Sequence, residues 1–155
     1  MAYFFAYGDR MNPDKMLETA PEATMVGPGR LDGYRLAFNV QSRSWGGGGA
    51  NAVADPAGSL WGVLWEVSYT DLEGFDSFRG DDGSAHRVLD LDVHGPDGPV
   101  QARTFLVVSD SGFIRPTERY VAMLRAVAER QGLPDEALTA IDRASNPSEA
   151  PPPSI

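Results

Sequence analysis

The chain has 155 residues, of which 42% are hydrophobic and 10% aromatic, so it is long enough for one well-packed domain and short for two. Its formal net charge of −9 repels phosphate backbones and acidic membranes, and we expect neither a nucleic-acid nor a membrane partner. The absence of cysteine excludes disulfides and Cys-type metal sites and favours a cytoplasmic protein.

The beginning of the chain predicts a buried strand followed by a short helix. Residues 3–7, YFFAY, are continuously apolar, as in a strand that is covered on both faces. Asn12 is a good N-cap and Pro13 suits the first helical position, so we expect a helix over 13–19. The features that follow in chain order are a strand at 30–40, a turn at 55–58 and a strand at 60–67.

The middle of the chain predicts a helix and then a β-hairpin. Thr70 and Glu73 have the spacing of a capping box, which opens a helix over 71–78. The alternating run 86–93 and the apolar run 100–108 flank the turn sequence HGPDGP. Such a pattern is typical of two antiparallel strands joined by a tight turn.

The end of the chain predicts two helices and a tail. Apolar residues at helical spacing predict a helix over 117–130, which ends at Gly132, and a second short helix is expected over 135–144. Residues 145–155 are Pro-rich and too poor in apolar side chains to pack, so we expect a disordered tail after one domain over 1–144. Five or six strands interrupted by short helices place this domain in the α+β class.

Four sequence blocks follow one another along the chain: YFFAYGDRMNPDKM, WGGGGANAV, GSLWGVLWEV and DLEGFDSFRG. Their order and spacing resemble the γ-glutamylcyclotransferase family, which includes AIG2-like and BtrG-like proteins. The resemblance implies a small mixed β-barrel flanked by short helices, with one cavity at its mouth. It also implies a reaction without metal or organic cofactor. In that reaction the α-amine of a γ-glutamyl group attacks its own γ-carbonyl and releases 5-oxoproline and a free amine.

The segment YGDRM matches the substrate-binding loop of that family, which usually reads Tyr-Gly-Ser-Asn-Leu/Met. Tyr7, Gly8 and Met11 agree with the pattern, so the resemblance assigns them to substrate binding. Asp9 and Arg10 replace the Ser-Asn pair. A carboxylate at Asp9 repels a ligand carboxylate that lies against the same loop.

Three further positions of the resemblance differ in chemistry. The catalytic glutamate of the family corresponds to Arg79, and a guanidinium stays protonated and cannot act as a general base. His86 stands where a tyrosine is common, and Phe105 lacks the hydroxyl of another common tyrosine. We therefore expect the usual cyclotransferase reaction to be weak or absent.

The altered residues leave alternatives open. If Asp9 and Arg79 face one cavity, Asp9 accepts a proton beside an Arg79 that binds an anionic group, or the two form a structural salt bridge in an inactive site. His86 either moves protons near neutral pH or only packs against the barrel. Trp45, beside the glycines 46–49, is the tryptophan expected to line a pocket.

Two functions from different classes remain. The first is a repurposed small-molecule enzyme of bacterial specialised metabolism, which catalyses γ-glutamyl removal, cyclisation, elimination or isomerisation. Its substrate carries an anionic or polarised oxygen group that Arg10 and Arg79 bind. The second is a non-catalytic relative that binds a small ligand or a partner protein. No metal is expected, because His86 and His94 lack the spacing of metal ligands.

Overall fold

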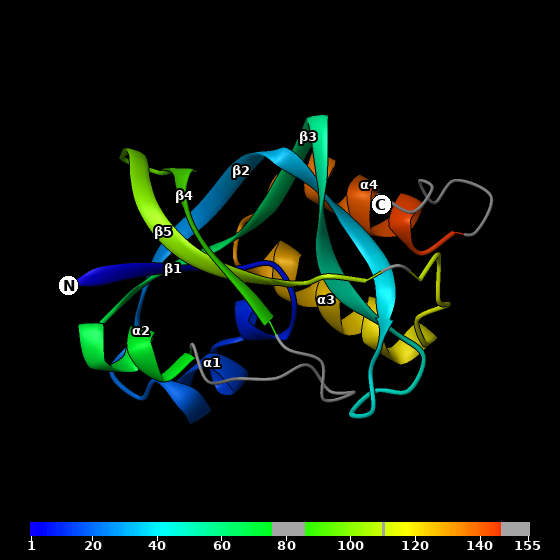
Figure 1. The fold of residues 1–155 in the computed structure, drawn as a ribbon, viewed down its shortest axis with the longest axis horizontal. Helices are drawn as coiled ribbons and strands as arrows, with labels where there is room; N and C mark the ends of the chain where they lie inside the picture. The colour runs from blue at the N-terminus through cyan, green and yellow to red at the C-terminus, as the bar shows by residue number, and fades with distance from the viewer. Residues whose placement is uncertain (76–85, 110, 147–155) are drawn as a thin grey trace.

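The computed structural model describes residues 1–75, 86–109 and 111–146, and within them five strands close into a barrel (Figure 1). The strands are β1 (Ala2–Ala6), β2 (Thr24–Gln41), β3 (Gly48–Val67), β4 (His86–Gly95) and β5 (Gly98–Val107). They are hydrogen-bonded in the order β1-β3-β2-β4-β5. β1 runs parallel to β5, whereas the other neighbouring pairs are antiparallel. The predicted α+β fold with a small mixed barrel is thus confirmed, as is the hairpin of β4 and β5.

Buried side chains help to close the barrel where β5 meets β1 and β3. The Thr104 hydroxyl donates to the carbonyl of Phe5 at 2.9 Å. The Asn51 amide on β3 donates to the carbonyl of Val107 at 2.8 Å and accepts the N–H of Val107 at 3.0 Å. Thr104 and Asn51 are each 2% exposed. These bonds therefore tie β5 to two strands from inside the barrel.

Helices lie outside the barrel, and α3 and α4 lie together on one side of it (Figure 1). Their bounds are α1 (Pro13–Thr19), α2 (Tyr69–Phe75), α3 (Glu118–Arg130) and α4 (Asp135–Ala144), and a 3-10 turn, η1 (Asp9–Met11), joins β1 to α1. The predicted bounds of α1 and α4 are confirmed. The helix predicted over 117–130 begins one residue later, because Thr117 is its N-cap and accepts the N–H of Tyr120 at 3.2 Å.

The predicted turn at 55–58 is wrong, because these residues lie within β3. Asp32 pairs with Ser59 and Tyr34 pairs with Ala54, so residues 55–58 bulge opposite a single residue of β2. A bulge of this kind uses the same turn-forming residues as a hairpin, which is why the local sequence does not distinguish the two.

β2 begins before the strand predicted at 30–40. Gly27, Pro28 and the glycine after it have the composition of a strand breaker, but β2 bulges between Met25 and Gly27 and continues through them. The strand therefore starts at Thr24.

The predicted capping box at Thr70 is also wrong. The hydroxyl of Ser68 accepts the N–H of Asp71 at 3.1 Å, so the cap lies two residues earlier and α2 begins at Tyr69. The predicted end of the helix over 71–78 lies outside the described residues.

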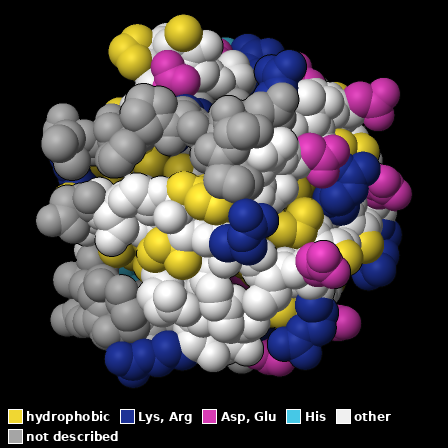
Figure 2. Space-filling view, turned by 90° about the vertical axis from the view of Figure 1, so that its right-hand side faces the viewer, with side chains coloured by type: hydrophobic (Ala, Val, Ile, Leu, Met, Phe, Trp, Pro, Cys, Tyr) yellow, Lys and Arg dark blue, Asp and Glu magenta, His cyan; other side chains and the backbone are white. Residues whose placement is uncertain are grey.

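The predicted domain over 1–144 and the disordered tail over 145–155 stay predictions, since 147–155 lie outside the described residues. No helix within the described ranges is both long and apolar enough to cross a bilayer. On the face shown in Figure 2, Lys and Arg side chains are interspersed with Asp and Glu, so neither sign of charge dominates it.

Candidate active site

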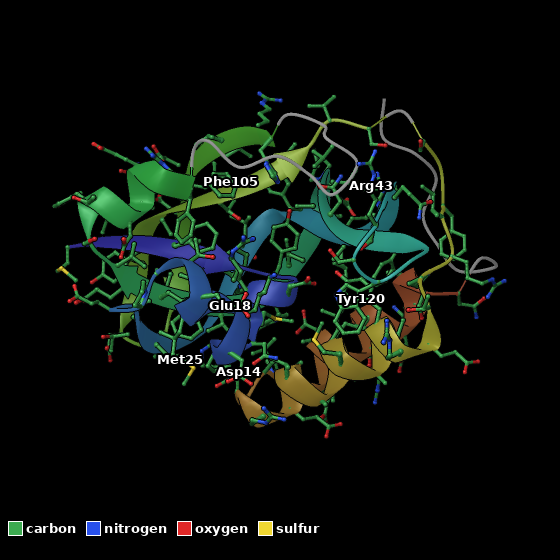
Figure 3. The ribbon with its side chains drawn as sticks, turned by 90° about the horizontal axis from the view of Figure 1, so that it is seen from below. Asp14, Glu18, Met25, Arg43, Phe105 and Tyr120 are labelled. Carbon is green, nitrogen blue, oxygen red and sulfur yellow. The ribbon has the colours of Figure 1, made fainter. Side chains whose placement is uncertain are left out.

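A cavity of about 410 Å³ lies where β1 ends and η1 begins. Its walls come from several elements, among them β5 with Phe105 and α3 with Tyr120 (Figure 3). The predicted site residues that line it are Tyr7, Gly8, Asp9, Arg10, His86 and Phe105. Residues from opposite ends of the sequence therefore meet at one place, as the resemblance implied.

Met11 and Trp45 were also predicted to touch the substrate, but they lie behind the cavity wall. Met11 is 2% exposed and packs in the hydrophobic core. The indole N–H of Trp45 donates to Oδ2 of Asp9 at 3.2 Å. Trp45 thus reaches the cavity through Asp9.

Asp9 has a second hydrogen-bond partner in Tyr120, whose side chain bonds to the carboxylate. The Tyr120 hydroxyl also accepts the backbone N–H of Ala50 at 3.1 Å. Burial raises the pKa of Tyr120 well above its usual value, and the charge of Asp9 raises it further. The hydroxyl therefore keeps its proton at neutral pH and donates it to Asp9.

The run of glycines explains how Trp45 reaches Asp9. Gly46 and Gly47 have φ angles of +73° and +69°, which favour glycine. A Cβ on Gly47 would lie 2.4 Å from the carbonyl oxygen of Arg115, and one on Gly48 would lie 2.0 Å from that of Ile114. The loop after β2 therefore packs against the segment that leads into α3, and this contact brings Trp45 close to Tyr120.

Cationic groups line the same cavity as Asp9. They are Arg10 on η1 and Lys15 on α1. The guanidinium of Arg10 lies 5.9 Å from the ring centre of Phe75, and Lys15 lies 3.6 Å from Glu18. Of the described residues that line the cavity, Asp9 alone carries a carboxylate. The cavity can therefore receive a ligand that has both an ammonium and an anionic group.

His86, Phe105 and Tyr7 form the wall on the side of β4 and β5. The rings of His86 and Phe105 have centres 5.3 Å apart. The Tyr7 hydroxyl donates to the carbonyl of Phe105. Burial raises the pKa of Tyr7, so its hydroxyl stays protonated and keeps this bond.

Sequence reasoning missed Tyr120, Lys15 and Asn51, all of which line the cavity. Tyr120 was assigned to the core because it stands at an apolar position of a helix, and it is indeed 3% exposed. Only its distance to Ala50 and Asp9, which lie far from it in sequence, reveals that its hydroxyl points to the site.

Arg79 lies outside the described residues. Whether it pairs with Asp9 or binds an anion therefore stays a prediction.

Comparison with known proteins gives consistent matches. The sequence profile of the AIG2-like family matches residues 59–140. Gamma-glutamylcyclotransferase of Homo sapiens is 27% identical over 147 residues, which cover 90% of this chain and 78% of that protein. The protein of the same name from Mus musculus is 26% identical over 138 residues, which cover 86% of this chain and 73% of that protein.

Solved structures share the fold. A structure of gamma-glutamyl cyclotransferase has a TM-score of 0.80 and 24% sequence identity, and the match covers 91% of this chain and 86% of that chain. YkqA from Bacillus subtilis has a TM-score of 0.76 and 25% identity, over 94% of this chain and 54% of that chain.

Proposed function

The chain belongs to the AIG2-like family, and from this premise we propose that it is an enzyme that releases an amine from a γ-glutamyl compound by ring closure. The family resemblance is confirmed, and the relatives are named gamma-glutamylcyclotransferases. What this chain requires is a proton acceptor other than the usual glutamate, because Arg79 occupies that position.

The observation that supports the proposal is the position of Asp9. Its carboxylate lines the cavity and accepts hydrogen bonds from Trp45 and Tyr120, which fix its orientation. A fixed carboxylate can bind the α-ammonium of a γ-glutamyl group and take a proton from it as the nitrogen attacks. Asp9 therefore takes the role of general base.

The reaction that follows is balanced without water. The α-nitrogen forms a bond to the γ-carbon, and the proton of the nitrogen passes to Asp9. The carbonyl oxygen carries the negative charge of the tetrahedral intermediate. The bond from the γ-carbon to the leaving nitrogen then breaks, and the protonated Asp9 returns its proton to that nitrogen. The products are 5-oxoproline and a free amine.

The cations of the cavity fit the remaining charge of such a substrate. The α-carboxylate of a γ-glutamyl group needs a cationic partner away from Asp9, and Arg10 and Lys15 line the same cavity. An arginine binds a carboxylate with two parallel hydrogen bonds. His86, which also lines the cavity, is the second group able to transfer a proton to the leaving amine.

The test is release of 5-oxoproline from a panel of γ-glutamyl dipeptides and γ-glutamyl amines. We expect turnover of at least one compound, and Asp9→Asn should reduce kcat at least about 100-fold. The matched control is Asp14→Asn, because Asp14 is exposed on α1 and should leave kcat unchanged (Figure 3). Turnover that survives Asp9→Asn would assign the base to another residue.

A second function is favoured by Arg79, which removes the usual base. In this alternative the protein binds a small ligand in the cavity without converting it. Thermal stabilisation by the panel compounds together with no 5-oxoproline from any of them would support binding over catalysis.

A further inference from the structure

The Trp45 indole forms a stack with two residues of α3. Its ring centre lies 5.3 Å from that of Tyr120, and the guanidinium carbon of Arg119 lies 5.0 Å from the indole ring centre. The Trp45 N–H then points to Asp9 at 3.2 Å. One side chain thus connects the start of α3 to the carboxylate of the cavity.

We propose that Trp45 is a positioning residue, which holds the Asp9 carboxylate toward the cavity through its indole N–H while Tyr120 and Arg119 hold the indole in place. This inference rests on the proposed role of Asp9 as proton acceptor. Trp45 touches neither the substrate nor the reacting atoms, and it acts through Asp9 alone.

The backbone supports this role. The N–H of Trp45 donates to the hydroxyl of Ser42 at 3.2 Å, and the N–H of Ser42 donates to the carbonyl of Gly47 at 2.8 Å. Gly47 forms a β-bridge with Pro116, at the start of α3. The loop that carries Trp45 is therefore fixed at both ends, and the indole is held rather than free to rotate.

Two donors on one carboxylate favour its charged form. The donors are the N–H of Trp45 and the hydroxyl of Tyr120. A cation over the face of an indole interacts favourably with the ring, so Arg119 keeps the donor in its place. The titratable or charged groups that face Asp9 or its partners from the neighbouring elements are Tyr7, Arg10, Lys15, His86, Arg119 and Tyr120.

The first experiment needs no substrate. The indole N–H resonances of the isotope-labelled full chain are followed from neutral to acidic pH, and Trp45→Phe identifies the resonance of Trp45. We expect this resonance to shift as Asp9 titrates, and the shift to be absent in Asp9→Asn. Asp9→Asn should also move the Trp45 resonance at neutral pH, where the fold is not under acid stress.

The other tryptophans are internal controls for that measurement. The indole N–H of Trp65 donates to the carbonyl of Arg10 at 3.1 Å, and within the described residues the N–H of Trp61 has no hydrogen-bond partner. Neither should follow Asp9. A Trp45 resonance that ignores both pH and the Asp9→Asn change would overturn the proposal.

The second experiment measures the pH profile of 5-oxoproline release. Trp45→Phe keeps an aromatic ring against Tyr120 but removes the donor, so the acid limb should move upward by about one pH unit. Trp61→Phe is the matched control and should leave the profile unchanged, because its N–H bonds to nothing in the described chain. An unmoved acid limb in Trp45→Phe contradicts the positioning role.

The two experiments separate this inference from the proposed function. If Asp9→Asn retains 5-oxoproline release while the Trp45 resonance still follows Asp9, the proposed function fails and the contact stands. If Asp9→Asn abolishes release while the resonance does not respond, the function stands and the positioning role is overturned.

Discussion

At the scale of single residues, ion pairs on the barrel surface respond to pH. The Nε and Nη2 atoms of Arg103 on β5 bond to the two carboxylate oxygens of Asp90 on β4, at 2.8 and 3.0 Å. These hydrogen bonds hold the pKa of Asp90 below its usual value. The pair therefore stabilises the fold when Asp90 is ionised.

The direction of the pH effect follows from that shift. Because the pKa of Asp90 is lower in the folded state than in the unfolded chain, the stabilisation is complete above about pH 4 and is lost as the pH falls through the folded-state value. We expect Asp90→Asn to lower the free energy of unfolding by less than about 1 kcal/mol at neutral pH, since the pair is partly exposed.

Urea denaturation at neutral pH and near pH 2 would measure this effect. The difference between wild type and Asp90→Asn should disappear at the lower pH. Asp92→Asn, an exposed position on the same strand opposite Gln101, is the control and should change little at either pH. A difference that is equal at both pH values would show that Asp90 acts through packing.

Individual site residues could be predicted to the extent that a sequence block carries them. Tyr7, Gly8, Asp9 and Arg10 are consecutive, so recognising one loop located all of them at the cavity. Tyr120 could not be found this way, because a tyrosine on an apolar helix face has the same pattern whether its hydroxyl is used or not.

At the scale of elements, the close contact between the loop after β2 and the segment before α3 gives a steric prediction. A Cβ on Gly48 would lie 2.0 Å from the carbonyl oxygen of Ile114 and 3.2 Å from the Cβ of Phe38. The backbone must move to admit a methyl group, so Gly48→Ala should lower the free energy of unfolding by about 1–3 kcal/mol.

Thermal and urea denaturation would test the prediction for Gly48. The control is Gly74→Ala in α2, because a Cβ there meets nothing within 4 Å and alanine favours the helix. Gly74→Ala should be neutral or slightly stabilising. Equal stability of the two variants would mean that the loop and the segment before α3 separate without cost.

Elements differ in how far local sequence determines them. The bounds of α1 and α4 could be predicted because a cap such as Asn12 lies within the helix's own sequence neighbourhood. The bulge at 55–58 could not, because it depends on the register between β2 and β3, in which Asp32 pairs with Ser59. Register is set by partners that are distant in sequence.

At the scale of the whole molecule, periodicity predicted strands and helices but not the closed barrel. The barrel was expected only from the family resemblance, since closure depends on one parallel contact between β1 and β5, at Phe4 and Arg103. Side chains reinforce that closure from within, and the Asn51 amide is the residue whose loss should affect it most.

Asn51→Ala is therefore a test of barrel closure. The substitution leaves the N–H and C=O of Val107 without the side-chain partner that bonds them at 3.0 and 2.8 Å, and it removes the donor to Asn39 at 3.0 Å. Buried polar groups without partners cost about 1–3 kcal/mol each, so the free energy of unfolding should fall by about 2–4 kcal/mol. Asn12→Ala, which removes only a helix cap, should cost about 1 kcal/mol.

Hydrogen exchange distinguishes a loss of closure from a general loss of stability. The Val107 amide should exchange faster in Asn51→Ala than the amides of β2 and β3, because those strands keep their own long ladder. Since Phe105 and Leu106 precede Val107 in the cavity wall, KM for the γ-glutamyl compound should rise as well. Uniform acceleration across all strands would show instead that Asn51 supports the whole core, and that β5 does not open on its own.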